Sequence, residues 1–526
     1  MTSPLTMAAS LSDLLVTDDT TILLGLIAAT VFLLNNLYRP QPLVHPILLG
    51  RQSDVARVRN SGESAVYRNY GTGLMGRCFA LRPAKEVYIL ADFLRPDSDA
   101  FRTLWSTSNP QLQDRVAAFG TGLLRLAVYH QRPSSRVPFN PVVYPCSLQL
   151  ISSVLETHPP SAIITHATML TQILELIYDA GEANRNHTII VVGEPSPQAM
   201  ASVASKVKVL KFSDVEREGI RVEKIISPLP KPSDVFTVSF FASESGHIQV
   251  AAVRALLPLS HAPSPLDTVV SAHTLGTAYG RAIAYTALFE GTSFATLDSS
   301  KLFHPDESTP QINVVDALSS KAYPIPPPTI AFLKPGHLHT LVHAILKEAR
   351  KSFLLAGISE GFVTKESLWD RLVFDAARAR VAGDRSGSLR AVIISEGPLA
   401  ADTLTPARVA LSVPVINCYS HPLVAGPVLA SHALDLQELK NEASSAAHTG
   451  PPSINIEAKL VGMEDEPVER GADPVGFLMV RGPSVGKLTS MEASYVSIPS
   501  GEDEGWVGTG LRATVQTNGA FQLLTQ

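Results

Sequence analysis

Short β-branched segments alternate with helical patterns over most of this sequence, and this alternation limits the possible folds more than any other feature. The expected strands are SAIITH (161–166), HTIIVVGE (187–194), VFTVSFFAS (235–243), TIAFLKP (329–335), LRAVIISEG (389–397) and VPVINCYS (413–420). The helical patterns between them include ATMLTQILELIYDA and GHLHTLVHAILKEARKSFLL. Strands and helices in this order form parallel sheets with helices on their faces. The sequence therefore predicts an α/β fold with layered, largely parallel sheets.

The pattern changes after about residue 450, where strands dominate, as in SINIEAKLV and GFLMVRG. In the final stretch, Asn518-Gly519 separates ATVQT from AFQLL. Asn-Gly accepts the positive φ angles of a two-residue hairpin turn, so a terminal hairpin is expected. We therefore predict an α/β domain over residues 61–450, completed by a β-rich part over residues 451–526.

An apolar stretch near the start, TTILLGLIAATVFLLNNLY (20–38), has no charged residue. Its apolar length of about 17 residues is at the short end of what a tilted helix needs to cross a bilayer. Basic residues follow the stretch, which by the positive-inside rule places the main body in the cytosol. We predict a short non-cytosolic N-terminus (1–20), one N-terminal transmembrane helix (21–38) and a Pro-rich linker (39–60). A buried core helix is the alternative.

Composition excludes some classes of protein. Hydrophobic residues make up 45% of the chain and charged residues 17%, as in an ordered globular protein. The net charge of −5 gives no basic footprint for nucleic acid, and the three cysteines form no zinc or disulfide pattern. His339 and His343 are one helical turn apart, but an amphipathic helix explains them better than a metal site. We expect no nucleic-acid partner and assign no metal ligand.

The stretch FFASESGHIQ (240–249) follows a predicted strand and is rich in Ser and Gly, as phosphate-binding turns are. It contains neither the Walker pattern nor a G-x-S-x-G nucleophile turn. Ser243, Ser245 and Gly246 are the candidates for phosphate contact here. An ordinary junction between strand and loop is the alternative.

Taken in order along the chain, five segments resemble the AMP-forming acyl-CoA synthetase family, within the adenylate-forming superfamily. The likeness covers roughly residues 60–526 and is nearest to long-chain fatty acid ligases that carry an N-terminal membrane segment. The five segments are QLQDRVAAFGTGLL, similar to an early helix; VFTVSFFASESGH, similar to the phosphate loop; VVSAHTLGTAYGRAIAYTALFEGTSFATL, similar to the acyl pocket; VPVINCYSHPLVAGPVL, similar to the adenine-binding turn; and EGWVGTGLRATVQTNGAFQLL, similar to the W-x-x-T-G-D segment.

The resemblance implies a large adenylation domain and a two-step reaction. A long-chain fatty acid attacks the α-phosphate of ATP to give acyl-adenylate and pyrophosphate, and the thiol of coenzyme A then displaces AMP. ATP and Mg²⁺ are the implied cofactors. Carried over by position, the implied binding residues are Ser243, Ser245 and Gly246 for phosphate, Tyr419 for adenine, Thr509 and Gly510 in the W-x-x-T-G-D segment, and His273 and Tyr279 for the acyl group.

Several positions depart from the family pattern. Glu244 stands where the phosphate loop has glycine, Leu423 where a glutamate holds Mg²⁺, and Leu511 where an aspartate binds ribose. The sequence ends at Gln526, before the family's hinge and C-terminal lid, so we expect that lid to be absent. We assign no catalytic residue and expect ATP-driven ligation to be impaired or lost. The alternative is a non-catalytic protein that binds acyl chains or a partner protein. The expected location is the surface of the endoplasmic reticulum, a lipid droplet or a peroxisome.

Overall fold

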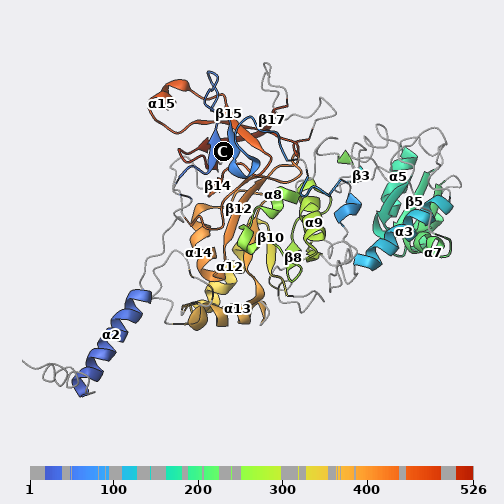
Figure 1. Cartoon of the computed structure of the whole chain (residues 1–526). Coiled ribbons are helices and arrows are strands. Elements are labelled where there is room, and N and C mark those ends of the chain that lie inside the picture. The colour runs from blue at the N-terminus through green and yellow to red at the C-terminus, as the bar shows by residue number, and fades with distance from the viewer. Residues whose placement is uncertain are drawn as a thin grey trace, which may run out of the picture.

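The architecture is a set of α/β and β layers, seen in the computed structural model of the chain (Figure 1). The structure describes residues 18–37, 48, 50–80, 82–88, 90–93, 109–126, 142–143, 162–179, 187–203, 207–223, 238–239, 250–297, 315, 318, 327–352, 363, 365, 367, 369–383, 387–436, 446–486 and 505–524.

A six-stranded sheet with the order β13-β12-β11-β10-β8-β9 lies at the centre of the molecule. Its strands are β8 (Thr268–Ser271), β9 (Ser293–Thr296), β10 (Ile330–Leu333), β11 (Ala391–Ile394), β12 (Val415–Ser420) and β13 (Pro427–Ala430). All neighbours are parallel except β12 and β13, which pair antiparallel. The predicted strands at 329–335, 389–397 and 413–420 are therefore confirmed as β10, β11 and β12 in a parallel sheet.

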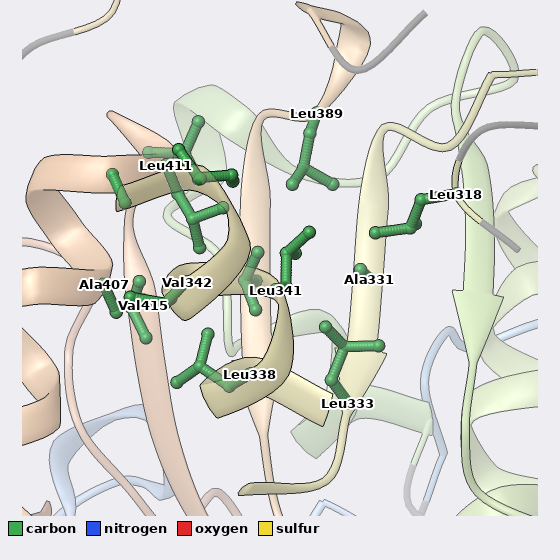
Figure 2. Close-up of a cluster of buried hydrophobic side chains, with 14 of the residues drawn as sticks. Leu318, Ala331, Leu333, Leu338, Leu341, Val342, Leu389, Ala407, Leu411 and Val415 are labelled. Atoms are coloured by element: carbon green, nitrogen blue, oxygen red, sulfur yellow. The ribbon is translucent and has the colours of Figure 1, made fainter. Parts of the chain in front are cut away.

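Helices cover both faces of this sheet. They are α8 (Val250–Arg254), α9 (Ala278–Glu290), α12 (Pro335–Ala349), α13 (Asp375–Ala382) and α14 (Ala401–Leu411). Successive residues of a strand point to opposite faces. Accordingly, Ile330 and Phe332 pack with α8 and α9, whereas Ala331 and Leu333 pack with α12 and α14. Figure 2 shows the second cluster, in which Leu338 and other side chains of α12 lie over the sheet. Strands buried on both faces need continuous apolar runs, which is what the sequence supplies.

A seven-stranded antiparallel sheet has the order β1-β2-β15-β16-β17-β18-β14. Its elements are β1 (Ser53–Val55), β2 (Tyr67–Asn69), β14 (His448–Gly450), β15 (Glu457–Val461), β16 (Val475–Arg481), β17 (Val507–Val515) and β18 (Phe521–Leu523), with α15 (Asp465–Glu469) between β15 and β16. The predicted terminal hairpin is confirmed as β17 and β18, paired antiparallel. The sheet also includes residues from the predicted linker and from the start of the predicted α/β domain, because β2 pairs with β15.

A smaller three-stranded parallel sheet contains β4 (Ile163–His166), β5 (His187–Val192) and β6 (Val207–Lys211). It packs with α3 (Asn109–Arg125), α5 (Leu170–Asp179), α6 (Pro197–Ala201) and α7 (Phe212–Ile220), and a two-stranded sheet joins β3 (Val142–Val143) to β7 (Val238–Ser239). The predicted strands at 161–166 and 187–194 are thus confirmed as β4 and β5. Of the predicted strand at 235–243, only β7 lies in the described residues.

The apolar N-terminal stretch forms the helix α2 (Asp19–Leu37). Its large apolar side chains from Ile22 to Leu33 are exposed, so the alternative of a buried core helix is wrong. Within the described ranges, no helix is both long enough and apolar enough to cross a bilayer. The predicted transmembrane helix is therefore not supported.

The terminal hairpin depends on Gly519, and a substitution there tests the closure of the seven-stranded sheet. Gly519 has φ +81°, and a Cβ atom there would lie 2.0 Å from Oγ of Ser53. Ser53 donates a hydrogen bond to the carbonyl of Gly519 at 2.9 Å, which fixes β1 against the turn. We expect Gly519→Ala to lower the free energy of unfolding by more than ~2 kcal/mol in urea denaturation, because backbone strain and a clash add together.

Gly471→Ala is the matched control for this substitution. Gly471 also has positive φ, at +95°, but a Cβ atom there would meet open space. It should therefore show only the backbone cost of about 1–2 kcal/mol. Equal effects of the two substitutions would contradict the role of the contact with Ser53.

Candidate functional site

The carboxyl ends of four neighbouring parallel strands carry polar side chains. His273 follows β8, Lys334 follows β10, Ser395 and Glu396 follow β11, and Tyr419 lies near the end of β12. Carboxyl ends of parallel strands meet at one edge of a sheet, and open α/β sheets bind ligands at that edge. The structure therefore places the predicted acyl-side residue His273 and the predicted adenine-side residue Tyr419 along the same edge.

His273 is fully buried and contacts two side chains from the end of β11. Its Nε2 lies 2.9 Å from Oγ of Ser395 in a hydrogen bond, and its Nδ1 lies 3.1 Å from Oε1 of Glu396. Oε2 of the same carboxylate lies 3.1 Å from Nζ of Lys334. The Nε2 atom is thus hydrogen-bonded, and the Nδ1 atom faces the Glu396 carboxylate. Sequence reasoning missed Ser395, Glu396 and Lys334, although polar residues directly after three apolar strands were a usable signal.

The loop that carries His273 is held in place by the residues on either side of it. The backbone N–H of His273 donates to Oγ of Ser271 at 3.1 Å. Thr277 caps α9 by accepting a hydrogen bond from the N–H of Gly280 at 3.1 Å. Arg281 donates through Nη1 to the carbonyls of Leu275 at 3.1 Å and Gly276 at 3.0 Å. These bonds fix the turn between β8 and α9, so His273 keeps one position against Ser395 and Glu396.

Glu396 adopts an unusual backbone conformation for a residue with a side chain. Its φ is +62°, in the left-handed region, which costs a non-glycine residue about 1–3 kcal/mol and occurs most often at functional sites. Burial alone would raise the pKa of the Glu396 carboxyl, but the contacts with His273 and Lys334 lower it to about 2. The carboxylate is therefore ionised at every physiological pH.

Tyr279, the other residue predicted for the acyl side, lies beside His273. The two rings are 5.1 Å apart in an edge-on arrangement, and Tyr279 is 3% exposed. Burial first, and then the neighbouring Cys418, raise the pKa of the Tyr279 hydroxyl well above its usual value. The side chain of Ser395 acts in the opposite direction and lowers this pKa. The structure thus brings together both residues predicted for the acyl side.

Tyr419 and Thr509 also come together, although 90 positions apart in the sequence. The Thr509 side chain reaches the Tyr419 hydroxyl, whose pKa is raised by burial. Oγ1 of Thr509 donates to the carbonyl of Leu478 at 3.0 Å, which ties β17 to β16. Gly510, the next residue, has φ +73°, and a Cβ atom added there would meet open space. The predicted adenine residue and the predicted W-x-x-T-G-D residues therefore share one location between the two large sheets.

The two leucines at the predicted magnesium and ribose positions pack into apolar surroundings. Leu423 is 2% exposed and Leu511 packs against the core of the seven-stranded sheet. Neither can supply an oxygen ligand or accept a hydrogen bond from a sugar hydroxyl. In the part of the chain that is described, no group of three or more His, Cys, Asp or Glu residues could hold a metal ion. The described residues at this position therefore do not fit the Mg²⁺ ion that the resemblance implies.

The remaining predicted site residues, Ser243, Ser245 and Gly246, lie outside the described residues. His339 and His343 lie on α12 with their rings 6.2 Å apart and stacked.

Comparisons with solved structures show the same architecture in adenylate-forming enzymes. An anthranilate CoA ligase in complex with anthranoyl-AMP matches with a TM-score of 0.55 and 15% identity, over 85% of this chain and 79% of that one. The chain has the fold of an adenylation domain. A benzoate CoA ligase from Burkholderia xenovorans matches with a TM-score of 0.52 and 14% identity, over 82% of this chain and 79% of that one.

An adenylation domain of a keto acid-selecting module, bound to keto acyl adenylate, gives a TM-score of 0.52 and 12% identity. This match covers 85% of this chain and 81% of that one. No protein-family model and no curated protein matches the sequence. The chain thus shares its fold with these structures at 15% sequence identity or less.

His421 gives the site a pH dependence that can be measured. It is 6% exposed, its Nδ1 accepts a hydrogen bond from the N–H of Leu423 at 3.2 Å, and burial lowers its pKa to about 4. Because the folded pKa lies below the unfolded value, the unfolded chain binds the extra proton first as the pH falls. We expect the midpoint of urea unfolding to decrease between about pH 6.5 and pH 4.

His421→Asn should reduce this loss of stability, because the Asn oxygen can still accept from Leu423 but does not titrate. His343→Gln, at an exposed position on α12, should leave the pH profile unchanged. Profiles of the wild-type protein and His421→Asn with the same slope would show that His421 does not set the pH dependence.

Proposed function

We propose that this protein is an acyl-CoA synthetase-like protein that binds a carboxylic acid at the carboxyl edge of the six-stranded sheet and has lost ATP-dependent activation of that acid. The observation that carries the proposal is the pair Leu423 and Leu511. Leu423 is buried and Leu511 packs against the core of the seven-stranded sheet, at the positions where the resembled family has the magnesium and ribose carboxylates. Loss of two charged contacts to a nucleotide removes most of the electrostatic stabilisation that adenylation requires.

The acid side of the site supports retained binding. His273, Tyr279 and Ser395 form a buried polar group at the end of β8 and β11, held by the hydrogen bonds of the β8–α9 turn. By resemblance, the proposed ligands are a long-chain fatty acid and coenzyme A. Two of the similar structures hold an acyl adenylate, which agrees in kind with an acid-binding site in this fold.

Pyrophosphate exchange tests the loss of activation. With purified protein, ATP, Mg²⁺ and oleate, labelled pyrophosphate should not enter ATP above the rate measured without oleate. The physical reason is that neither Leu423 nor Leu511 can hold the metal ion or the ribose. A benzoate CoA ligase assayed with benzoate shows that the assay detects exchange. Exchange by this protein that depends on oleate would refute the loss of activity.

The exposed apolar helix α2 supports attachment to a membrane, with the main body in the cytosol. We propose the surface of the endoplasmic reticulum, a lipid droplet or a peroxisome as its location. Burying apolar side chains such as Leu24 and Phe32 in lipid is favourable by about 25 cal/mol per Å². These side chains are 61% and 71% exposed in the protein.

Flotation with phosphatidylcholine vesicles tests this attachment. The full chain should float with the vesicles, whereas Leu24→Glu combined with Phe32→Glu should abolish flotation, because two charges would have to enter the lipid. Leu259→Glu, at a position 96% exposed outside α2, is the control and should float. Equal flotation of all three proteins would exclude α2 as the anchor.

A further inference from the structure

Within the proposed acid site, Lys334 forms an ion pair with a carboxylate of the protein itself, that of Glu396. Glu396 is joined to Lys334 at 3.1 Å and to His273 at 3.1 Å. The strand order β11-β10-β8 places Lys334 between the strand that carries Glu396 and the strand that leads to His273. The cation therefore lies in the middle of the proposed site.

The position of Lys334 favours a negative charge for a second reason. Lys334 is the N-cap of α12, a helix of 15 residues, and no side chain caps this N-terminus. The N-terminal end of a helix carries partial positive charge and attracts anions. The Lys334 ammonium group and the N-terminal end of α12 therefore both attract a carboxylate at this position.

The ion pair between Glu396 and Lys334 is also weak enough for another carboxylate to replace Glu396. The side chains of Lys334 and Glu396 are 38% and 27% exposed, and ion pairs in contact with water are weak. Glu396 reaches this bond from a left-handed backbone with φ +62°.

We propose that Lys334 anchors the carboxylate of the bound acid, and that Glu396 occupies this anchor when no acid is bound. The inference rests on the proposed binding function and names the residue that recognises the acid group. When the acid binds, its carboxylate replaces that of Glu396 at Lys334. The positive charge of Lys334, which is already in the site, then neutralises the charge of the ligand.

Equilibrium binding of a fluorescent long-chain fatty acid, displaced by oleate or by oleyl alcohol, tests this anchor in the full chain. Glu396→Gln removes the internal competitor and should tighten oleate binding by about fivefold. Lys334→Met should weaken oleate binding by at least about tenfold, because a charged hydrogen bond is lost. Oleyl alcohol, which has no carboxylate, should bind alike to wild type and both variants.

The pair Lys351 and Glu348, at the other end of α12, supplies matched controls. Its atoms are 2.7 Å apart and Lys351 is 62% exposed, so Lys351→Met and Glu348→Gln make the same charge changes outside the site. Both should bind oleate as the wild type does. Thermal unfolding of each variant checks that the fold is retained.

The outcomes separate the anchor from the proposed function. Oleate binding that is unchanged in Lys334→Met, or not tightened in Glu396→Gln, would overturn the anchor while leaving acid binding in place. No saturable binding of the fatty acid to wild type or to Glu396→Gln would overturn the binding function itself, and the anchor with it.

Discussion

Burial on both faces is the constraint on which the arrangement of the six-stranded sheet depends. Ile330 and Phe332 face one helical layer while Ala331 and Leu333 face the other, so no position within β10 can carry a charge. The six strands contain no charged residue, and charged side chains appear only beyond their ends. That is where His273, Lys334 and Glu396 lie, and their side chains are brought together because the apolar strands end at a common edge.

The two sides of the proposed site differ in their chemistry. On the proposed acid side, charged and polar groups are joined to one another by hydrogen bonds and ion pairs. On the proposed nucleotide side, Leu423 is buried and Leu511 is partly buried against the core of the seven-stranded sheet, and the buried His421 accepts a hydrogen bond from the N–H of Leu423. Both leucines stabilise the fold by burying apolar surface.

Much of the fold could be predicted from the sequence, because its signals are local. Continuous apolar runs marked β10, β11 and β12, and Asn518-Gly519 marked the terminal hairpin. The nearness of His273 and Tyr279 also followed from sequence, since a short turn and the start of α9 join them. The contact of His273 with Ser395 could not be predicted, because the two are 122 positions apart and their meeting depends on the order of the strands. A single sequence does not contain that order, and for the same reason the pairing of β2 with β15 was missed.

The pairing of β1 and β2 with the C-terminal strands has a consequence for the order in which the molecule is assembled. Ser53 bonds to Gly519 across 466 positions, whereas β8 to β13 all lie between residues 268 and 430. Contacts between distant residues form slowly, because a long loop must close before they stabilise the chain. During synthesis the six-stranded sheet can form before β15 and the terminal hairpin, which contact β2 and β1, have been made. The edge of β2 then stays unpaired until β15 leaves the ribosome, and Ser53 gains its bond to Gly519 only after the turn between β17 and β18 has followed.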